Sequence, residues 1–250
     1  RKLELYSARN GVSKSPFVNT YHQITIDCEL LEWNIDKELI FFGSLPGTST
    51  SKVELESIDN YSEERYRLLQ GTDKVHPLIL IRNYMKDKEE ELFFVEDFAR
   101  YAGYPLTQIQ HYLTNLSNNG FVYYDYGEQR IRVLQKTHNY IKAKSEKGDY
   151  DVMSFESQIN SVGSTDKMRV NSALNLVTKD LNVLGVPQII LSDSQKVYIY
   201  PNNGRLIVKK NRDFVFSGHI SAGNGRFNLF GQDFYFHYDS FWVDLNRIDS

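Results

Sequence analysis

Residues 92–133 read LFFVEDFARYAGYPLTQIQHYLTNLSNNGFVYYDYGEQRIRV, and this stretch decides the fold prediction. Leu92–Val95 predicts a short strand, and Glu96–Ala102 predicts a short helix that turns Phe98 and Ala99 inward. The sequence Gly103-Tyr104-Pro105 then predicts a turn.

A longer helix and a hairpin are predicted after this turn. Thr107 is expected to cap the helix, and Asn118-Asn119-Gly120 is expected to end it. The inward stripe of the helix consists of Ile109, Tyr112, Leu113 and Leu116. Phe121–Tyr126 and Arg130–Leu134 predict two strands that are joined at Gly127.

Two further helices are predicted before this stretch. One begins after the N-cap residue Ser62, and the next has Pro77 in its first turn. From Pro77 onward the predicted order is helix, strand, helix, turn, helix, strand, wing, strand, and this order resembles the winged-helix family. The resemblance implies a recognition helix that binds DNA. Residues 60–148 are therefore predicted to form a helical, winged-helix-like domain.

The charges of this module disfavour nucleic acid as its partner. The recognition helix carries no lysine or arginine, although contacts to phosphate supply most of the affinity of DNA-binding proteins. The candidate nucleic-acid-binding residues of the helix and the wing are Thr107, Gln108, Gln110, His111, Asn115, Gln129, Arg130 and Arg132. A protein-docking role is favoured over DNA binding, and Tyr123, Tyr124 and Tyr126 on the wing suit such an interface. The pleat of the hairpin is expected to place some of these tyrosines in the core.

The segments on either side of the helical domain have the alternation of β-strands. In residues 1–59, strands are predicted at Gln23–Asp27, Leu30–Asn34, Leu39–Phe42 and Val53–Ser57, after a polar linker over residues 1–15. This segment alone has few strands to close a core, so we expect it to join residues 149–250 in one sheet.

Residues 149–250 predict a closely spaced array of short strands. An apolar residue two positions before a glycine recurs at Gly43, Gly185, Gly218 and Gly231. Such a pattern is typical of a β-solenoid or a stacked, jellyroll-like array, in which glycines turn the corners. An ordinary β-sandwich with glycine turns is the alternative. The predicted fold class is α+β, with the winged-helix-like module inserted between β-rich segments.

Composition and motifs argue against catalysis and against a cofactor. The formal net charge is −3 and Cys28 is the single cysteine of the 250 residues. No histidine pair has the spacing of a metal site, and no nucleophile elbow or phosphate-binding glycine loop occurs. No apolar run reaches the length of a membrane-spanning helix. We therefore expect no enzyme activity, cofactor, metal or membrane span.

A second resemblance concerns most of the chain, from about Phe17 to Ser250. It is carried by residues 93–101 (FFVEDFARY), 149–152 (DYDV), 191–195 (LSDSQ) and 208–213 (VKKNRD). These phrases resemble large, uncharacterised, envelope-associated proteins of the Bacteroidetes. The resemblance implies an internal fragment of a longer β-rich protein at the cell envelope or in the periplasm, with no known catalytic residues. The first residue, Arg1, is consistent with such a fragment.

These observations favour a non-catalytic function. We expect a structural or protein-interaction segment of a larger multi-domain protein, whose partner is a protein, either the rest of the parent chain or an envelope assembly. The alternative function is that of a DNA-binding winged-helix regulator.

Overall fold

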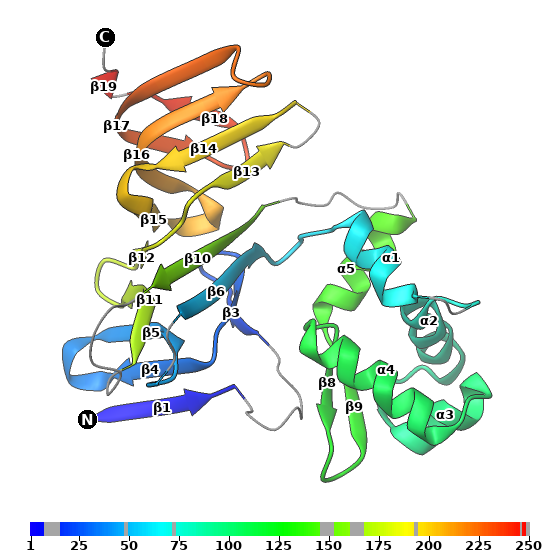
Figure 1. The fold of residues 1–250 in the computed structure, drawn as a ribbon. Helices are drawn as coiled ribbons and strands as arrows, with labels where there is room; N and C mark the ends of the chain where they lie inside the picture. Colours follow the sequence, from blue (N-terminus) through cyan, green and yellow to red (C-terminus); the bar gives the residue numbers. More distant parts are fainter. Residues whose placement is uncertain are drawn as a thin grey trace. The chain divides into compact units, whose positions relative to one another are not determined.

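A computed structural model describes residues 1–7, 16–47, 50–71, 74–145, 153–160, 168–192, 195–245 and 247–248 of the chain. The described residues fall into two compact units. Unit 1 takes them from Arg1–Tyr6, Phe17–Ile58 and Val152–Ser250, and unit 2 from Ser7–Pro16 and Asp59–Asp151. Figure 1 shows that unit 1 is built of strands, whereas unit 2 combines helices with a small sheet. The protein is therefore α+β and rich in strand.

Unit 1 contains sixteen described strands. They are β1 (Lys2–Tyr6), β2 (Phe17–Asn19), β3 (Ile24–Asp27), β4 (Leu30–Asn34), β5 (Leu39–Ser44), β6 (Thr50–Ser57), β10 (Ser154–Asn160), β11 (Arg169–Asn175), β12 (Leu181–Val183), β13 (Ile189–Ser192), β14 (Val197–Pro201), β15 (Leu206–Val208), β16 (Phe214–Ala222), β17 (Phe227–His237), β18 (Trp242–Asp244) and β19 (Arg247–Ile248).

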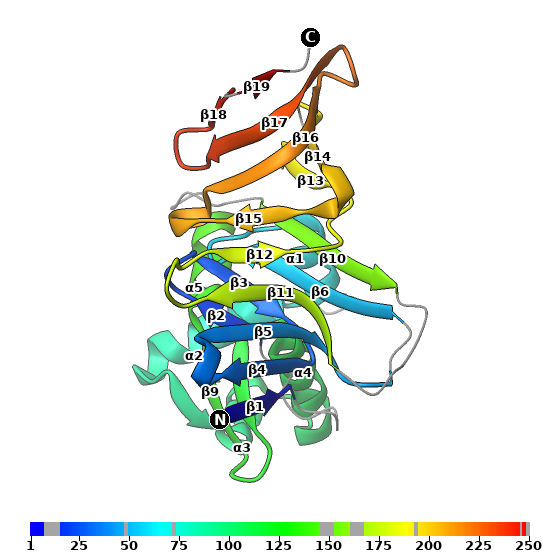
Figure 2. The same ribbon diagram turned by 90° about the vertical axis from the view of Figure 1, so that its left-hand side faces the viewer.

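These strands form one antiparallel sheet that folds back on itself. Its order is β1-β4-β5-β11-β12-β15-β16-β14-β13-β10-β6-β3-β2, and β17 extends it from β16. The sheet turns at strand β16, whose two halves pair with different strands. Phe214 and Val215 pair with β15, whereas Gly218–Ser221 pair with β14. One arm of the sheet runs from β1 through β5 to β15 and is shown in Figure 2. The other arm runs from β14 through β10 to β2.

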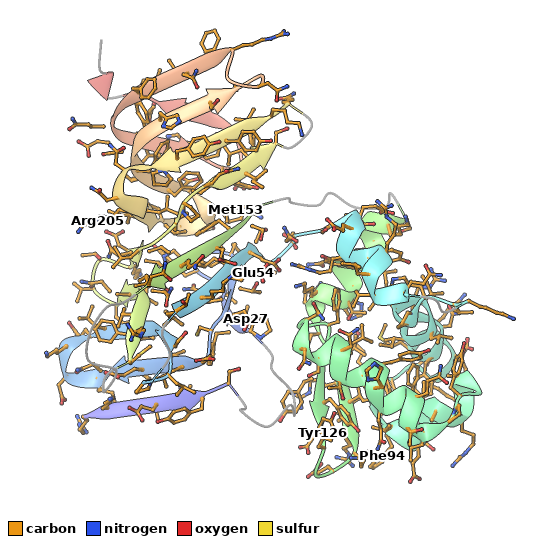
Figure 3. All side chains as sticks on the ribbon, viewed as in Figure 1. Asp27, Glu54, Phe94, Tyr126, Met153 and Arg205 are labelled. Atoms are coloured by element: carbon orange, nitrogen blue, oxygen red, sulfur yellow. The ribbon has the colours of Figure 1, made fainter. Side chains whose placement is uncertain are left out.

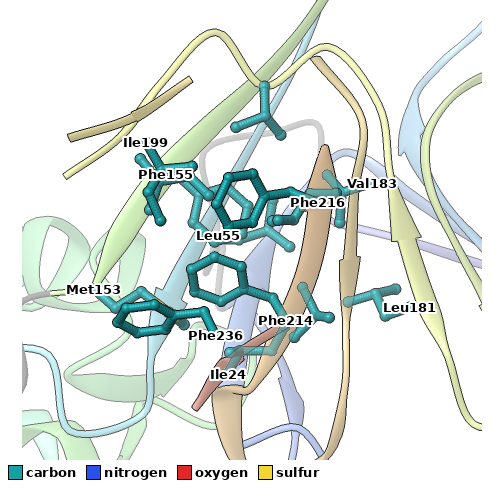
Figure 4. Packing of buried hydrophobic residues seen from close by; sticks show 14 of the residues in the cluster. Ile24, Leu55, Met153, Phe155, Leu181, Val183, Ile199, Phe214, Phe216 and Phe236 are labelled. Atoms are coloured by element: carbon teal, nitrogen blue, oxygen red, sulfur yellow. The ribbon is translucent and has the colours of Figure 1, made fainter. Parts of the chain in front are cut away.

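The two arms of the sheet enclose one apolar core. Leu181, Val183, Leu206 and Val208 come from one arm, and Ile24, Leu55, Phe155 and Ile199 come from the other. Figure 4 shows how Phe214, Phe216 and Phe236 pack among them. These side chains are the inward members of alternating strands, so their burial follows from the period of two that the sequence displays.

The expected union of the two β segments is confirmed. Strand β10 pairs with β6 over seven residues, from Ser154↔Glu56 to Asn160↔Thr50. Strand β11 pairs with β5 in the same antiparallel sense. The first and the last of the three predicted segments therefore contribute to one unit and one core.

The expected β-solenoid is not what the described strands form. Stacked coils of a solenoid pair in parallel, whereas every pair described in unit 1 is antiparallel. The arrangement is an open, folded antiparallel sheet, in which β1 and β2 occupy the two ends of the order.

Two of the recurring glycines accompany irregular pairing rather than solenoid corners. A Cβ on Gly43 would lie 1.7 Å from the Arg169 carbonyl oxygen, and one on Gly218 would lie 2.1 Å from that of Tyr200. Both glycines lie beside a register shift, in the β5–β11 and β16–β17 pairs. Glycine permits this close approach of neighbouring backbones and the local bend that goes with it.

A buried amide connects the two arms. Asn171 of β11 is fully buried, and its Nδ2 lies 3.2 Å from the Ser51 carbonyl oxygen of β6 and 3.1 Å from that of Ser157 of β10. The Ser51 hydroxyl donates to Asn171 Oδ1. Because both ends of the amide are satisfied, this polar group is accommodated inside the core.

The predicted linker over residues 1–15 is wrong at its start. Lys2–Tyr6 forms β1, which pairs with β4 from Lys2↔Asn34 to Tyr6↔Leu30. The alternation of Lys2, Leu3, Glu4 and Leu5 is that of a strand, although its short length and polar flanks conceal it. Residues 8–15 lie outside the described residues.

Unit 2 contains five helices and a three-stranded sheet in its described residues. They are α1 (Glu63–Gln70), α2 (Pro77–Lys88), β7 (Leu92–Phe94), α3 (Val95–Ala102), α4 (Leu106–Asn118), β8 (Val122–Asp125), β9 (Arg130–Val133) and α5 (Gln135–Lys144). The sheet is antiparallel with the order β7-β9-β8. Its core combines Phe98 of α3, Leu113 of α4 and Ile131 of β9.

Two of the predicted helix starts in unit 2 are confirmed. The Ser62 hydroxyl caps α1 by accepting a hydrogen bond from the Arg65 backbone N–H at 3.2 Å. Pro77 is the first residue of α2. The cap of α2 is His76, whose Nδ1 accepts from the Leu78 N–H at 3.1 Å. The imidazole is buried and stacks on Tyr66 with ring centroids 3.7 Å apart.

Candidate interaction surface

Helix α4 has one buried face and one polar face without cations. Ile109, Leu113 and Leu116 are buried, as their spacing predicts. Thr107 does not cap the helix, which is a correction: the N-cap residue is Pro105, whose carbonyl accepts from the N–H groups of Gln108 and Ile109. Thr107, His111 and Asn115 are exposed on the outer face of α4.

The glutamines predicted to read bases are engaged inside the unit. Gln110 Nε2 donates to Gln129 Oε1 at 3.0 Å, so α4 and the hairpin are tied together. Gln129 Nε2 donates to the Tyr126 carbonyl oxygen at 2.7 Å, and the Tyr124 hydroxyl donates to Gln129 Oε1 at 3.0 Å. Gln108 donates to the Tyr112 hydroxyl at 2.6 Å. The Gln110 and Gln129 amides therefore hold the wing against α4, whereas the Gln108 bond stays within α4.

The tyrosines of the wing divide between core and surface. Tyr124 is buried, and burial raises the pKa of its phenol, which therefore stays protonated as a donor to Gln129. Tyr126 stacks on Tyr124 with ring centroids 4.0 Å apart, and its hydroxyl is hydrogen-bonded to that of Thr114 on α4. Tyr123 points the opposite way and is exposed. This alternation was expected from the pleat of the hairpin.

The outer face of the small sheet, which we term the wing-sheet face, is both apolar and cationic. One row across the strands consists of Leu92 on β7, Arg132 on β9 and Tyr123 on β8. The next row consists of Phe94, Arg130 and Asp125. Figure 3 labels Phe94 and Tyr126 among the side chains of unit 2.

The wing-sheet face lies opposite the surface on which α4 packs. Phe93, Tyr124 and Ile131 alternate with the residues of the two rows and are buried against the helices. Arg130 and Arg132 therefore project on the side of the sheet away from the core to which α4 contributes. Of the eight candidate residues, the structure joins Gln110 to Gln129, but it does not bring the two arginines to the α4 surface.

Leu92 and Phe94 were not among the predicted site residues. Leu92–Val95 was interpreted only as a strand, without an assignment of its two faces. The signal was present, because Leu92 and Phe94 alternate with Phe93 and Val95, and only one of these two faces meets the helices.

A shallow hollow also lies in unit 2, between α1 and the C-terminal end of α4. It measures about 420 Å³ and is lined by Ser62, Glu64, Arg65, Leu68, Leu69, Asn115 and Asn119. Its lining contains no histidine, cysteine or tyrosine. The Ser62 hydroxyl in this lining is the N-cap of α1 and accepts from the Arg65 backbone N–H.

The described residues contain no group of three or more His, Cys, Asp or Glu side chains placed to hold a metal ion. His219 stacks between Tyr200 and Phe230. His237 stacks on Trp242, and its Nε2 donates to a carboxylate oxygen of Asp244 at 3.0 Å. Within the part of the chain that the structure describes, no helix is long and apolar enough to cross a membrane.

No protein-family model matches the chain, and no curated protein or solved structure is significantly similar to it. The geometry of the two units is therefore the basis for assigning a function.

Proposed function

We propose that the chain is a non-catalytic, structural and protein-interaction segment of a larger multi-domain protein, in which unit 2 is a winged-helix-like docking module. The order of α2, β7, α3, α4, β8 and β9 supports the winged-helix assignment, as does the addition of β7 to the hairpin strand β9. The resemblance to Bacteroidetes proteins supports an assembly at the cell envelope as its setting.

One observation carries the proposal. The polar face of α4 has no cation, and the two wing arginines project from the opposite side of the sheet. A DNA-reading helix needs phosphate contacts on the same surface as its base-reading side chains, because those contacts supply the affinity and fix the register. Gln110 and Gln129 are hydrogen-bonded to each other, so they serve the fold of unit 2.

The second candidate is a DNA-binding regulator. It is favoured by the exposed Thr107, His111 and Asn115, which lie along one face of α4 and carry groups that are able to contact bases.

The experiment that separates the two is fluorescence anisotropy of a labelled, mixed-sequence DNA duplex titrated with the whole chain at about 50 mM and about 200 mM salt. Under the docking proposal no saturable binding occurs at the lower salt concentration. Saturable binding that weakens steeply with salt and is lost in His111→Ala/Asn115→Ala would overturn the proposal and establish the regulator.

A further inference from the structure

We propose that the wing-sheet face is the docking surface of unit 2 and that its partner is an acidic protein segment with two carboxylates beside apolar side chains. This inference rests on the proposed function, since it names the surface and the partner class of the docking module. It depends on the exposure, the charge and the register of six side chains.

Apolar exposure on this face is concentrated. Leu92, Phe94 and Tyr123 are 47%, 45% and 46% exposed, and they flank the central strand on both sides. The inner face of the same sheet contributes Phe93, Tyr124 and Ile131 to the core. Aromatic residues, aliphatic residues and arginine together have the composition of a protein–protein interface rather than of a solvated sheet.

The two arginines form a cationic stripe along the middle of the face. Arg132 lies between Leu92 and Tyr123, and its guanidinium has no hydrogen-bond or ion-pair partner among the described residues. Arg130 lies over the Phe94 ring, 4.6 Å from its centroid, and 3.5 Å from a Glu128 carboxylate oxygen. Apolar neighbours lower the local dielectric around a guanidinium, so a carboxylate that docks there gains more than on an open surface.

The spacing of the arginines selects the partner. Residues two apart on one strand face are separated by about 6.6 Å. Acidic residues at alternate positions of an extended segment have the same spacing, and so each carboxylate is able to meet one guanidinium. The apolar residues that flank such acids then cover Leu92, Phe94 and Tyr123.

Two other occupants fit less well. In a symmetric pair of chains the faces would bring four arginines together, and like charges at that distance repel. A nucleic acid would place phosphates against Asp125 on the face and Glu128 beside it, and would leave three apolar side chains without apolar contacts. An acidic protein segment satisfies both the charges and the apolar area.

The test is a selection of peptides from a random displayed library on the whole immobilised chain. A labelled copy of each enriched peptide is then titrated by anisotropy against the native chain and against Arg130→Glu/Arg132→Glu. The matched control is Arg82→Glu/Arg226→Glu, which makes the same change of charge at two exposed positions on other elements. Thermal unfolding verifies that each variant is folded.

We expect the enriched peptides to carry acidic residues at alternate positions beside apolar ones. Their affinity should fall about tenfold or more in Arg130→Glu/Arg132→Glu, as for the loss of a central arginine anchor. It should change less than about threefold in the control variant. A Leu92→Ser/Tyr123→Ser variant, which keeps both arginines, should also weaken binding about tenfold.

Two results would overturn the inference. Enriched peptides without an excess of acidic residues would refute the partner class, and peptides whose binding is unchanged in both face variants would refute the surface. In either case the docking function itself survives. By contrast, saturable binding of the DNA duplex that Arg130→Glu/Arg132→Glu abolishes would refute the inference and the proposed function together.

Discussion

We expect the stability of unit 2 to fall in acid because of one buried residue, His76. Its Nδ1 accepts from the Leu78 N–H at 3.1 Å, and its Nε2 lies 2.8 Å from the Tyr66 carbonyl oxygen. These two contacts require the neutral tautomer with its proton on Nε2. Burial lowers the pKa of His76, and nearby Lys144 lowers it further. Protonation would add a proton at Nδ1 and abolish the cap of α2.

The magnitude of a His76→Ala substitution follows from the lost contacts. The cap contributes about 1 kcal/mol. A buried carbonyl left without its donor costs about 1–3 kcal/mol. The stacked rings of His76 and Tyr66 contribute about 0.5–1.5 kcal/mol. Because these contributions overlap, we expect His76→Ala to reduce the stability of unit 2 by about 2–4 kcal/mol.

The pH dependence has a definite sign. Since the folded pKa of His76 lies below its unfolded value of about 6.5, the unfolded chain takes up the proton first as pH falls. The contribution of His76 to stability is therefore complete above pH 6.5 and is lost as pH falls from there toward the folded pKa. His76→Asn keeps a capping oxygen that does not titrate, and this variant should lose that part of the pH dependence.

Hydrogen exchange measured by mass spectrometry is the suitable assay, because it follows peptides of α1 and α2 separately from those of unit 1. The native chain, His76→Ala and His76→Asn are compared at about pH 5 and about pH 8, after correction for the intrinsic exchange rate. A change of less than about 0.5 kcal/mol in the opening free energy of α2 in His76→Ala would contradict the capping role of His76. The assigned titration of His76 is contradicted if His76→Asn retains the pH dependence of the native chain.

Three further predictions concern contacts within unit 1 or within unit 2. Asn171→Leu should lower the free energy of unfolding of unit 1 by about 3 kcal/mol, measured by urea denaturation, because the Ser51 and Ser157 carbonyls lose a buried donor. An unchanged midpoint would contradict that role. Gly43→Ala should lower it by about 3 kcal/mol or more, since the new Cβ meets the Arg169 carbonyl oxygen. Gly127→Ala, where only Asp125 lies near, at 3.4 Å, is the matched control. Gln110→Ala should lower the opening free energy of the β8–β9 hairpin by about 0.5–1.5 kcal/mol, which is measured as faster hydrogen exchange. An unchanged exchange rate would show that the Gln110–Gln129 bond does not hold the wing.

Local signals in the sequence located most elements. Ser62 and Pro77 mark the starts of α1 and α2 because a hydroxyl cap and a fixed φ act within one turn. The prediction that Thr107 caps α4 was wrong, although it used the same kind of local signal. Threonine is a good capping residue, but the backbone carbonyl of Pro105 already begins the helix two residues earlier.

Non-local pairing was not readable in the same way. The glycine pattern predicts a corner at Gly231, whereas in the structure the single strand β17 continues through this residue. A glycine is compatible with a corner, a bulge or a close approach, and only the partner strand decides which one occurs. The expectation of a solenoid arose from that ambiguity.

The candidate site was predictable in part. The eight residues predicted from the winged-helix resemblance all lie on α4, the hairpin or β9, but their grouping depends on which face of each element meets the core. The alternation of Tyr123 and Tyr124 was anticipated, whereas the outward position of Leu92 and Phe94 was not. A hydrogen bond such as Gln110 to Gln129 joins two elements through side chains, and no spacing rule predicts it.

The antiparallel pairing of β6 with β10 makes residues 59–151 of unit 2 an insertion between two adjacent strand ends. Ser154 lies opposite Glu56, and the Ser57 N–H donates to the Met153 carbonyl oxygen at 3.0 Å. A hairpin turn of about two to five residues is enough to connect such ends. A short turn in place of residues 59–151 therefore requires no change in the β6–β10 register, so the β framework is able to carry a different recognition element at this position.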